Sequence, residues 1–162
     1  MTTLTWERFR GHATGYDVEL PGYNYRLDEI HAALGQVQLA KLTANNRRRH
    51  YLVSIYVEAL RDLSGWLVPF ADDEAGADHL MVVVAPDPGS RERVVAGLAG
   101  DRIQTSKHYP CIPDFTAFAA WQGADVGIAR EFASRAITLP LFPALNESDV
   151  HRICRLVRGF AA

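Results

Sequence analysis

The apolar pattern of the chain changes from a helical to a strand-like period near residue 66, and this change limits the fold more than any other feature. Before it, apolar residues recur at steps of three and four, which predicts two helices, one from about 27 to 42 and one from about 45 to 63. After it come short β-rich runs separated by helical patterns, at 66–68, 79–84, 102–106 and 137–139.

Helices are expected between and after these runs. Ser90 is the predicted cap of a helix over 91–98, and Asn146 is the predicted cap of a final helix. Short helical stretches are predicted at 115–121 and 125–136. Together the patterns predict an α+β fold, in which a small, mostly antiparallel sheet is covered by helices on one face and preceded by a long helical pair.

Composition narrows the classes of protein further. With 162 residues, 48% of them hydrophobic and 22% charged, we expect a single domain over residues 1–162. A net charge of −2 predicts no nucleic-acid partner, and the lack of a run of about 20 apolar residues predicts no membrane partner. The polar start of the chain does not resemble a signal peptide, so we expect a cytoplasmic protein. The two cysteines and the scattered histidines predict no metal site.

Several polar residues have an ordinary structural interpretation. The basic run Arg47–Arg49 is predicted to be a solvated or interface face of a helix. His31 and His79 are expected to be packed or surface residues, and His50 is isolated in the sequence. Cys111, next to a proline, is expected to be an inert thiol, because no base is placed beside it by the sequence.

Segments in a fixed order along the chain carry a resemblance to a known family. They are residues 22–39 (GYNYRLDEIHAALGQVQL), the arginine run, residues 79–83 (HLMVV), residues 108–110 (HYP) and residues 139–145 (LPLFPAL). In sequence and spacing they resemble the DegT/DnrJ/StrS sugar aminotransferases, which have the type I pyridoxal phosphate fold. The resemblance covers only the C-terminal, small-domain portion of such an enzyme, and it implies that the large domain that binds the cofactor is absent from this chain.

This resemblance has a chemical consequence, because the family's Schiff-base lysine lies in the large domain. The lysines of this chain are Lys41 and Lys107. Lys41 is interpreted as a solvated helix residue, and Lys107 is a weak candidate for the catalytic amine. We therefore expect no cofactor to be bound by this chain alone, and pyridoxal phosphate to be bound if a large domain complements it.

The resemblance also implies roles for particular residues. Asn24 and Arg26 would bind cofactor phosphate in the active site of a partner subunit, while Tyr25, His108 and Tyr109 would bind substrate. His108, Tyr109 and Lys107 are the catalytic candidates. The ordinary alternatives stay open: Asn24 caps the helix, Arg26 pairs with Asp28 or Glu29, and His108 is bonded to a backbone carbonyl.

One departure from the family concerns sugar recognition. Family members often carry a second histidine after the Tyr-Pro segment, whereas this chain continues from Cys111 to Phe115 without one.

Three functions from different classes follow. The first is a truncated or split aminotransferase homologue, unable to do pyridoxal chemistry alone, whose family activity is amino transfer to a keto-sugar nucleotide. Its partner would be a second copy in a homodimer or a chain that carries the cofactor-binding half. The second is a cofactor-independent binding protein or enzyme in a small-molecule pathway, which uses the pocket at His108 and Tyr109, together with Lys107 and Cys111. The third is a dimerisation module that self-associates through the apolar helix over 27–42.

Overall fold

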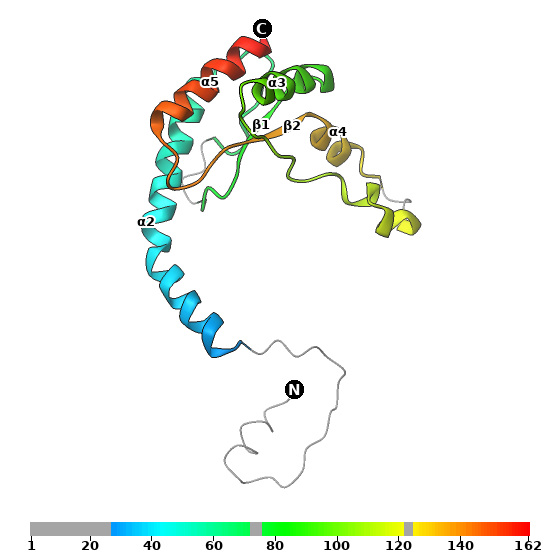
Figure 1. Cartoon of the computed structure of the whole chain (residues 1–162). Coiled ribbons are helices and arrows are strands. Elements are labelled where there is room, and N and C mark those ends of the chain that lie inside the picture. The colour runs from blue at the N-terminus through cyan, green and yellow to red at the C-terminus, as the bar shows by residue number, and fades with distance from the viewer. Residues whose placement is uncertain (1–26, 72–75, 122–124) are drawn as a thin grey trace, which may run out of the picture. The chain divides into compact units, whose positions relative to one another are not determined.

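The computed structural model of the chain describes residues 27–71, 76–121 and 125–162 (Figure 1). Residues 1–40 and 41–162 form separate units. The predicted site residues Asn24, Tyr25 and Arg26 lie outside the described part of the chain.

The described part of the first unit is the beginning of helix α2, which runs from Glu29 to Leu60. Asp28 starts this helix, because one of its carboxylate oxygens accepts a hydrogen bond of 2.9 Å from the backbone N–H of His31. The prediction of a helical pair is wrong, since α2 is continuous through residues 42–45. Neither glycine nor proline occurs between Gln36 and Leu60, so nothing in this stretch breaks the helix.

The second unit contains a two-stranded antiparallel sheet. Strand β1 (Met81–Val84) pairs with strand β2 (Ala136–Leu139). An isolated bridge joins Leu67 to β1, and another joins Ser106 to β2. The two further predicted strands therefore contribute only single bridges, but the prediction of a small antiparallel sheet in an α+β fold is confirmed.

The remaining helices lie close to their predicted positions. None of the helices in the described ranges has the length and hydropathy that a membrane crossing requires. The helices after β1 are α3 (Pro88–Gly100), the 3-10 turns η1 (Ile112–Asp114) and η2 (Thr116–Trp121), α4 (Gly127–Arg135) and α5 (Glu147–Ala161).

Of the two predicted caps, Ser90 is wrong for α3, whereas Asn146 is the observed cap residue of α5. The cap of α3 is Asp87, whose carboxylate accepts hydrogen bonds from the backbone N–H of Ser90 at 2.9 Å and from its hydroxyl at 2.6 Å. Asn146 does occupy the cap position of α5, but its side-chain amide donates to Asp149 at 3.3 Å. Asp87 precedes a proline, and proline is favoured in the first turn of a helix, which explains the earlier start of α3.

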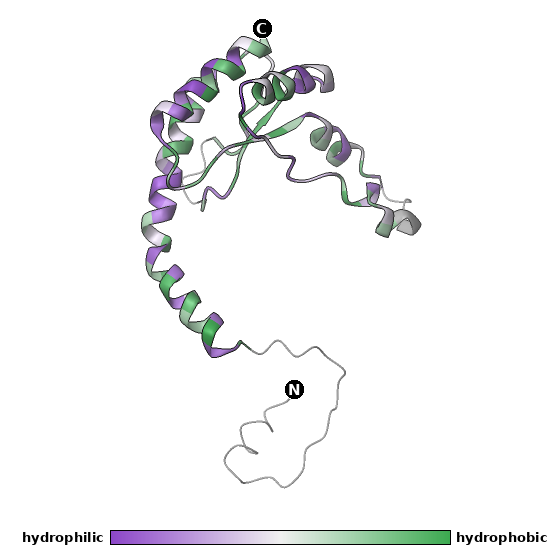
Figure 2. Ribbon diagram, in the orientation of Figure 1, coloured by the Kyte–Doolittle hydropathy of each residue, from purple (hydrophilic) through white to green (hydrophobic). Residues whose placement is uncertain are grey.

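The core of the second unit lies between the sheet and the helices. Figure 2 shows β1 and β2 as largely hydrophobic and α5 as hydrophobic on one side only. Tyr56 is fully buried in this core and donates a hydrogen bond of 2.9 Å to the carbonyl of Pro140. Burial raises the pKa of its phenol well above the ordinary range. The largest fully buried side chains are those of Tyr56, Leu52, Leu60, Met81, Leu98, Ile137, Val83, Val94, Val150 and Val157.

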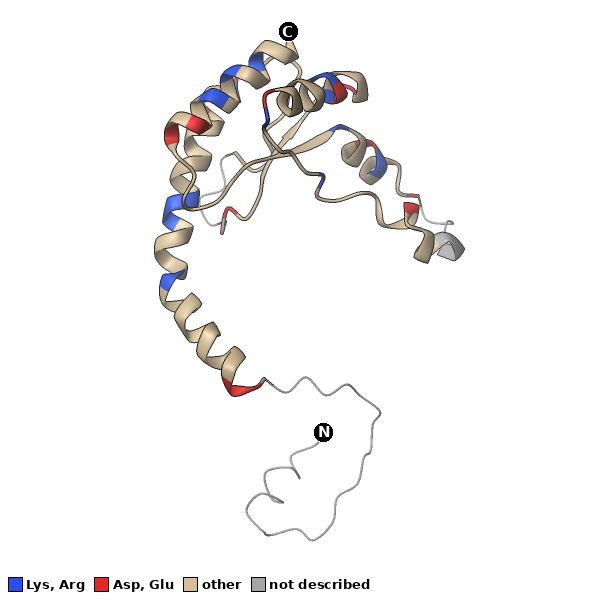
Figure 3. Ribbon diagram, viewed as in Figure 1, with Lys and Arg blue, Asp and Glu red and all other residues tan. Residues whose placement is uncertain are grey.

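The basic run on α2, marked in Figure 3, holds other parts of the second unit in place. Arg48 donates to a carboxylate oxygen of Glu147 at 3.1 Å and to the carbonyl of Leu145 at 3.0 Å. Tyr51 donates to the other carboxylate oxygen of Glu147 at 3.0 Å. The interpretation as a solvated or interface face is therefore wrong for Arg48, which fastens the start of α5 to α2.

Glu147 should make the stability of the fold sensitive to acid. Its bonds to Arg48 and Tyr51 lower the pKa of its carboxyl below the ordinary value of 4.5. The stabilisation it contributes is therefore present above pH 4.5 and is lost as the pH falls through the lower pKa of the folded state. We expect Glu147→Gln to unfold at a lower urea concentration than the parent chain at pH 7, and the difference to shrink below pH 4.5.

Glu131→Gln is the matched control for this prediction, because Glu131 is also exposed and, among the described residues, its carboxylate pairs with Arg135 one turn away on α4. A difference between Glu147→Gln and the parent chain that stays constant from pH 7 to pH 3 would contradict the prediction.

Candidate functional site

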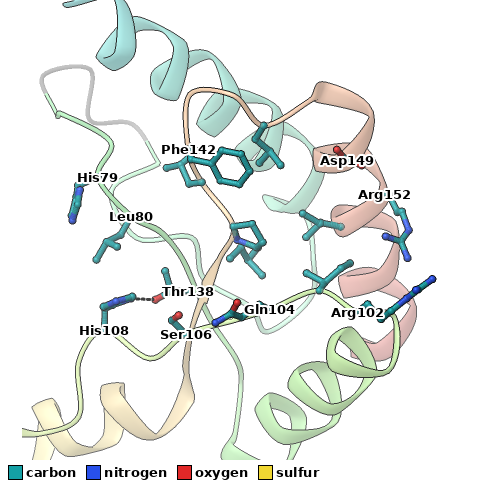
Figure 4. Close-up of a pocket in the computed structure, with 16 residues that line it drawn as sticks. His79, Leu80, Arg102, Gln104, Ser106, His108, Thr138, Phe142, Asp149 and Arg152 are labelled. Atoms are coloured by element: carbon teal, nitrogen blue, oxygen red, sulfur yellow. Dashed lines mark hydrogen bonds between the residues drawn. The ribbon is translucent and has the colours of Figure 1, made fainter. Parts of the chain in front are cut away.

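A cavity of about 460 Å³ lies beside the sheet in the second unit (Figure 4). Its walls come from the segment before β1, from residues 102–108, from the end of β2 with the following prolyl segment, and from the first half of α5. It therefore brings together three of the segments that carry the family resemblance, at His79 and Leu80, at His108 and in residues 139–145.

His108 is the best-placed polar residue of this cavity. Its ring nitrogen Nδ1 lies 3.1 Å from the Oγ1 of Thr138, which is buried on β2 (Figure 4). The backbone bridge between Ser106 and Thr138 brings the two residues to this distance. The partner of His108 is therefore a side-chain hydroxyl, and the alternative interpretation, in which His108 is bonded to a backbone carbonyl, is wrong. Because Thr138 occupies Nδ1, the Nε2 atom is the ring nitrogen that can meet a ligand.

The other two catalytic candidates do not join His108 in this cavity. Tyr109 packs its ring edge-on against that of His108, with the centroids 5.1 Å apart, but it lines a second cavity of about 750 Å³. Cys111 is buried and lines this second cavity too. Lys107 is exposed and is not among the residues that line either one. The prediction of one pocket at Lys107, His108, Tyr109 and Cys111 is therefore wrong: His108 lines the first cavity, Tyr109 and Cys111 line the second, and Lys107 lines neither.

One end of the first cavity is polar, and the residues that form it were not predicted as site residues from the sequence. Arg152 on α5 donates to the backbone carbonyl of Asp101 at 3.1 Å and pairs with its carboxylate at 3.3 Å. Arg102, which also lines the cavity, has a backbone φ of +61°, a left-handed conformation that is uncommon for arginine. No short-range signal points to this grouping, because Asp101, the partner of Arg152, is 51 positions away from it in the chain.

The histidines expected to be structural have different surroundings. His31 is exposed and lies 2.6 Å from the carboxylate of Asp28. His79 is exposed at the rim of the first cavity. His50 is not isolated, since its Nδ1 lies 2.8 Å from a carboxylate oxygen of Asp78.

The side chains of the first cavity are arranged in a way that supports the binding of a ligand. Within the described residues of the cavity, the imidazole of His108 is hydrogen-bonded to the hydroxyl of Thr138, and no carboxylate is hydrogen-bonded to this pair to complete a catalytic triad. The second thiol of the chain, Cys154, is buried in the core, and burial raises its pKa to about 11. The cavity is lined by the imidazole of His108, the hydroxyl of Thr138, two guanidinium groups, the carboxylate of Asp149 and apolar side chains, and this mixture of donors and acceptors suits a ligand that carries hydroxyl groups.

Comparison with known proteins agrees with the family resemblance found in the sequence. The model of the DegT/DnrJ/EryC1/StrS aminotransferase family matches residues 3–158. The chain is 32% identical over 146 residues to the dTDP-3-amino-3,6-dideoxy-α-D-galactopyranose transaminase of Aneurinibacillus thermoaerophilus, covering 90% of this chain and 39% of that enzyme. It is 29% identical over 153 residues to the UDP-N-acetyl-3-dehydro-α-D-glucosamine 3-aminotransferase of Acidithiobacillus ferrooxidans, covering 93% of this chain and 40% of that enzyme.

A solved structure agrees with these relatives. DesV of S. venezuelae, in complex with a ketimine intermediate, has a TM-score of 0.79 and 28% identity, with 99% of this chain and 45% of that chain covered. The chain spans about two fifths of the length of the curated relatives it matches. By its sequence and its fold, the chain belongs to the DegT/DnrJ/EryC1/StrS aminotransferase family.

Proposed function

We propose that this chain acts as the small-domain part of a sugar aminotransferase, and that amino transfer to a keto-sugar nucleotide requires a cofactor-binding part with its own lysine. The observation that carries this proposal is the combination of a family match over residues 3–158 with an unsuitable setting for both lysines of the chain. The names of the matched relatives, which are transaminases of nucleotide-linked sugars, support the substrate class.

Pyridoxal phosphate does not fit the described residues of this chain. A lysine that forms a Schiff base is activated by desolvation or by a neighbouring cation. Lys41 and Lys107 are both exposed, and neither lines the cavity beside His108. We therefore assign no step of pyridoxal chemistry to the residues described here.

The roles that we propose for this chain are in binding. His108 would donate a hydrogen bond through Nε2 to a sugar hydroxyl or a phosphate oxygen, with Thr138 holding the ring in place. Tyr109, next to it and exposed, would contact the sugar with its ring. Asn24 and Arg26 would bind the cofactor phosphate and Tyr25 the substrate, in trans to a partner that carries the cofactor. That partner would be a polypeptide with the lysine-bearing half or a second subunit of a homodimer.

Covalent trapping tests this proposal. Purified chain mixed with one equivalent of pyridoxal phosphate and reduced with borohydride should show no stoichiometric adduct by intact-mass spectrometry, because both lysines are exposed and neither is among the residues that line the cavities of the described part of the chain. When the lysine-bearing half of the A. thermoaerophilus transaminase is added, we expect stoichiometric labelling on that half. The mixture should then transfer an amino group to a dTDP-linked keto-sugar.

Lys41→Arg and Lys107→Arg are the matched variants, because each keeps the positive charge and removes one amine. Trace labelling that falls equally in both variants is the expected background. A full equivalent of adduct that disappears only in Lys107→Arg would overturn the proposal, and so would a failure of the added half to acquire cofactor in the presence of this chain.

A further inference from the structure

The segment of residues 76–80, here called the strap, forms a wall between two cavities. His79 and Leu80 line the cavity beside His108. Gly76, Asp78 and Leu80 line a neighbouring cavity of about 340 Å³. Leu80 and His108 line both cavities, so the strap lies where the two spaces adjoin. Figure 4 shows both residues in the first of these cavities.

Two consecutive residues of α2 hold the strap. The Nδ1 of His50 lies 2.8 Å from a carboxylate oxygen of Asp78. The guanidinium of Arg49 donates from Nε to the carbonyl of Ala77 at 3.2 Å. The side chain of Asp78 is only 15% exposed, compared with 50% for that of His50, so the contact is shielded on the strap side. In the described part of the chain, these are the hydrogen bonds between strap and helix.

One residue of the strap has a left-handed backbone conformation. Asp78 has a φ of +46°, in the left-handed region that residues with a Cβ atom seldom occupy. Such a conformation costs free energy and persists where the surroundings impose it, often in segments that switch between states. The contacts of Asp78 and Ala77 with α2 are the interactions that can impose it here.

We propose that His50 and Arg49 form a latch that keeps the strap closed, and that releasing the latch joins the two cavities beside His108 into one larger site. This deepens the proposed function by naming a device that sets the size of the ligand site, and it rests on that function only for the identity of the ligand. A closed strap keeps the cavity of about 460 Å³ separate from the one of about 340 Å³, and an open strap admits a longer ligand.

Backbone NMR relaxation on the full chain tests the latch without any assay of amino transfer. In the double variant His50→Ala/Arg49→Ala, the ¹⁵N order parameters of residues 77–80 should fall from about 0.85 to below about 0.6, while those of β1 and β2 remain rigid. A soluble paramagnetic agent should broaden the Leu80 methyl signals several-fold more in this variant than in the parent chain. Asp78→Asn, which removes only the carboxylate charge, should produce a smaller change in the same direction.

The double variant His31→Ala/Arg47→Ala is the matched control. It removes a histidine that is also paired with an aspartate and an arginine that neighbours Arg49, both exposed on the same helix. Order parameters of the strap that stay at the level of the parent chain in the latch variant would overturn the proposal. An equal loss of order in the control, or a loss in β1 and β2 as large as that in the strap, would overturn it as well. Because no cofactor or partner is present, these outcomes are independent of whether the chain assists an aminotransferase.

Discussion

Replacing Tyr56 by alanine should lower the free energy of unfolding by about 3–5 kcal/mol, which is the usual cost of deleting a large buried aromatic side chain. Tyr56 is fully buried between α2 and the sheet, so the deletion leaves a cavity in the centre of the core. It also removes the hydrogen bond to the carbonyl of Pro140, a residue that lines the cavity beside His108. Urea unfolding followed by circular dichroism measures the change.

Tyr51→Ala is the matched control, because Tyr51 lies on the same helix but is 46% exposed. It should lose the bond to Glu147 but create no cavity, so its effect should be clearly smaller. Tyr56→Phe separates the two contributions, since it keeps the ring and removes only the hydroxyl, at a cost of about 1 kcal/mol. Equal losses in Tyr56→Ala and Tyr51→Ala would show that burial of Tyr56 is not the source of its stability.

Gly97→Ala should lower the free energy of unfolding by about 1–3 kcal/mol, although alanine is ordinarily the better helix former. A Cβ atom at position 97 would lie 2.4 Å from a ring carbon of Phe160, and two further ring atoms would lie within 2.6 Å. The whole ring must therefore move, and Gly97 is the residue that lets α3 and α5 approach. Thermal unfolding by calorimetry is a suitable measurement.

The same helix provides the control for Gly97. A Cβ atom at Gly100 would meet nothing within 4 Å, so Gly100→Ala should leave stability unchanged or raise it by up to about 1 kcal/mol. Truncating the ring in Gly97→Ala/Phe160→Ala should give a total loss smaller than the sum of the two single losses, because the clash is removed with the ring. Strict additivity would exclude Phe160 as the cause.

The core and the ligand site share structural elements, so changes to one reach the other. Tyr56 bonds the carbonyl of Pro140, and Thr138 on β2 holds the ring of His108. The first half of α5 forms a wall of the same cavity, and Arg48 and Tyr51 fasten its start through Glu147. Strand β2 and α5 therefore provide the regular elements of the site, while residues 79–80, 102–108 and 140–145 line it from connecting segments.

Much of the fold could be predicted because local patterns and packing agree over most of the chain. The apolar stripe that contains Leu52, Ile55 and Tyr56 is buried as its helical period requires, and β2 forms where a short apolar run precedes Pro140. The prediction of a helix break near residue 43 is wrong. A change in the apolar pattern does not end a helix when neither glycine nor proline is present. The cap of α3 was misplaced by three residues, since both Asp87 and Ser90 are good capping residues.

The candidate site was predictable only in part. The family resemblance pointed to His108 and Tyr109, and the structure places the two rings together while turning them to different cavities. The roles of Asn24, Tyr25 and Arg26 remain predictions, since these residues lie outside the described ranges. The pairing of His50 with Asp78 had no signal in the sequence, because the two residues are 28 positions apart and belong to different elements.

The sequence by itself determined the family, the order of the elements and the inward faces of the helices, because these depend on residue type and on spacing over a few turns. The shortage of lysines was also visible at that level. Only the tertiary structure decided which hydroxyl holds His108, which cavity each aromatic residue lines and which arginines fasten α5 and the strap. Such contacts join residues that are distant in the chain, and their distances are set by the packing of whole elements against a common core.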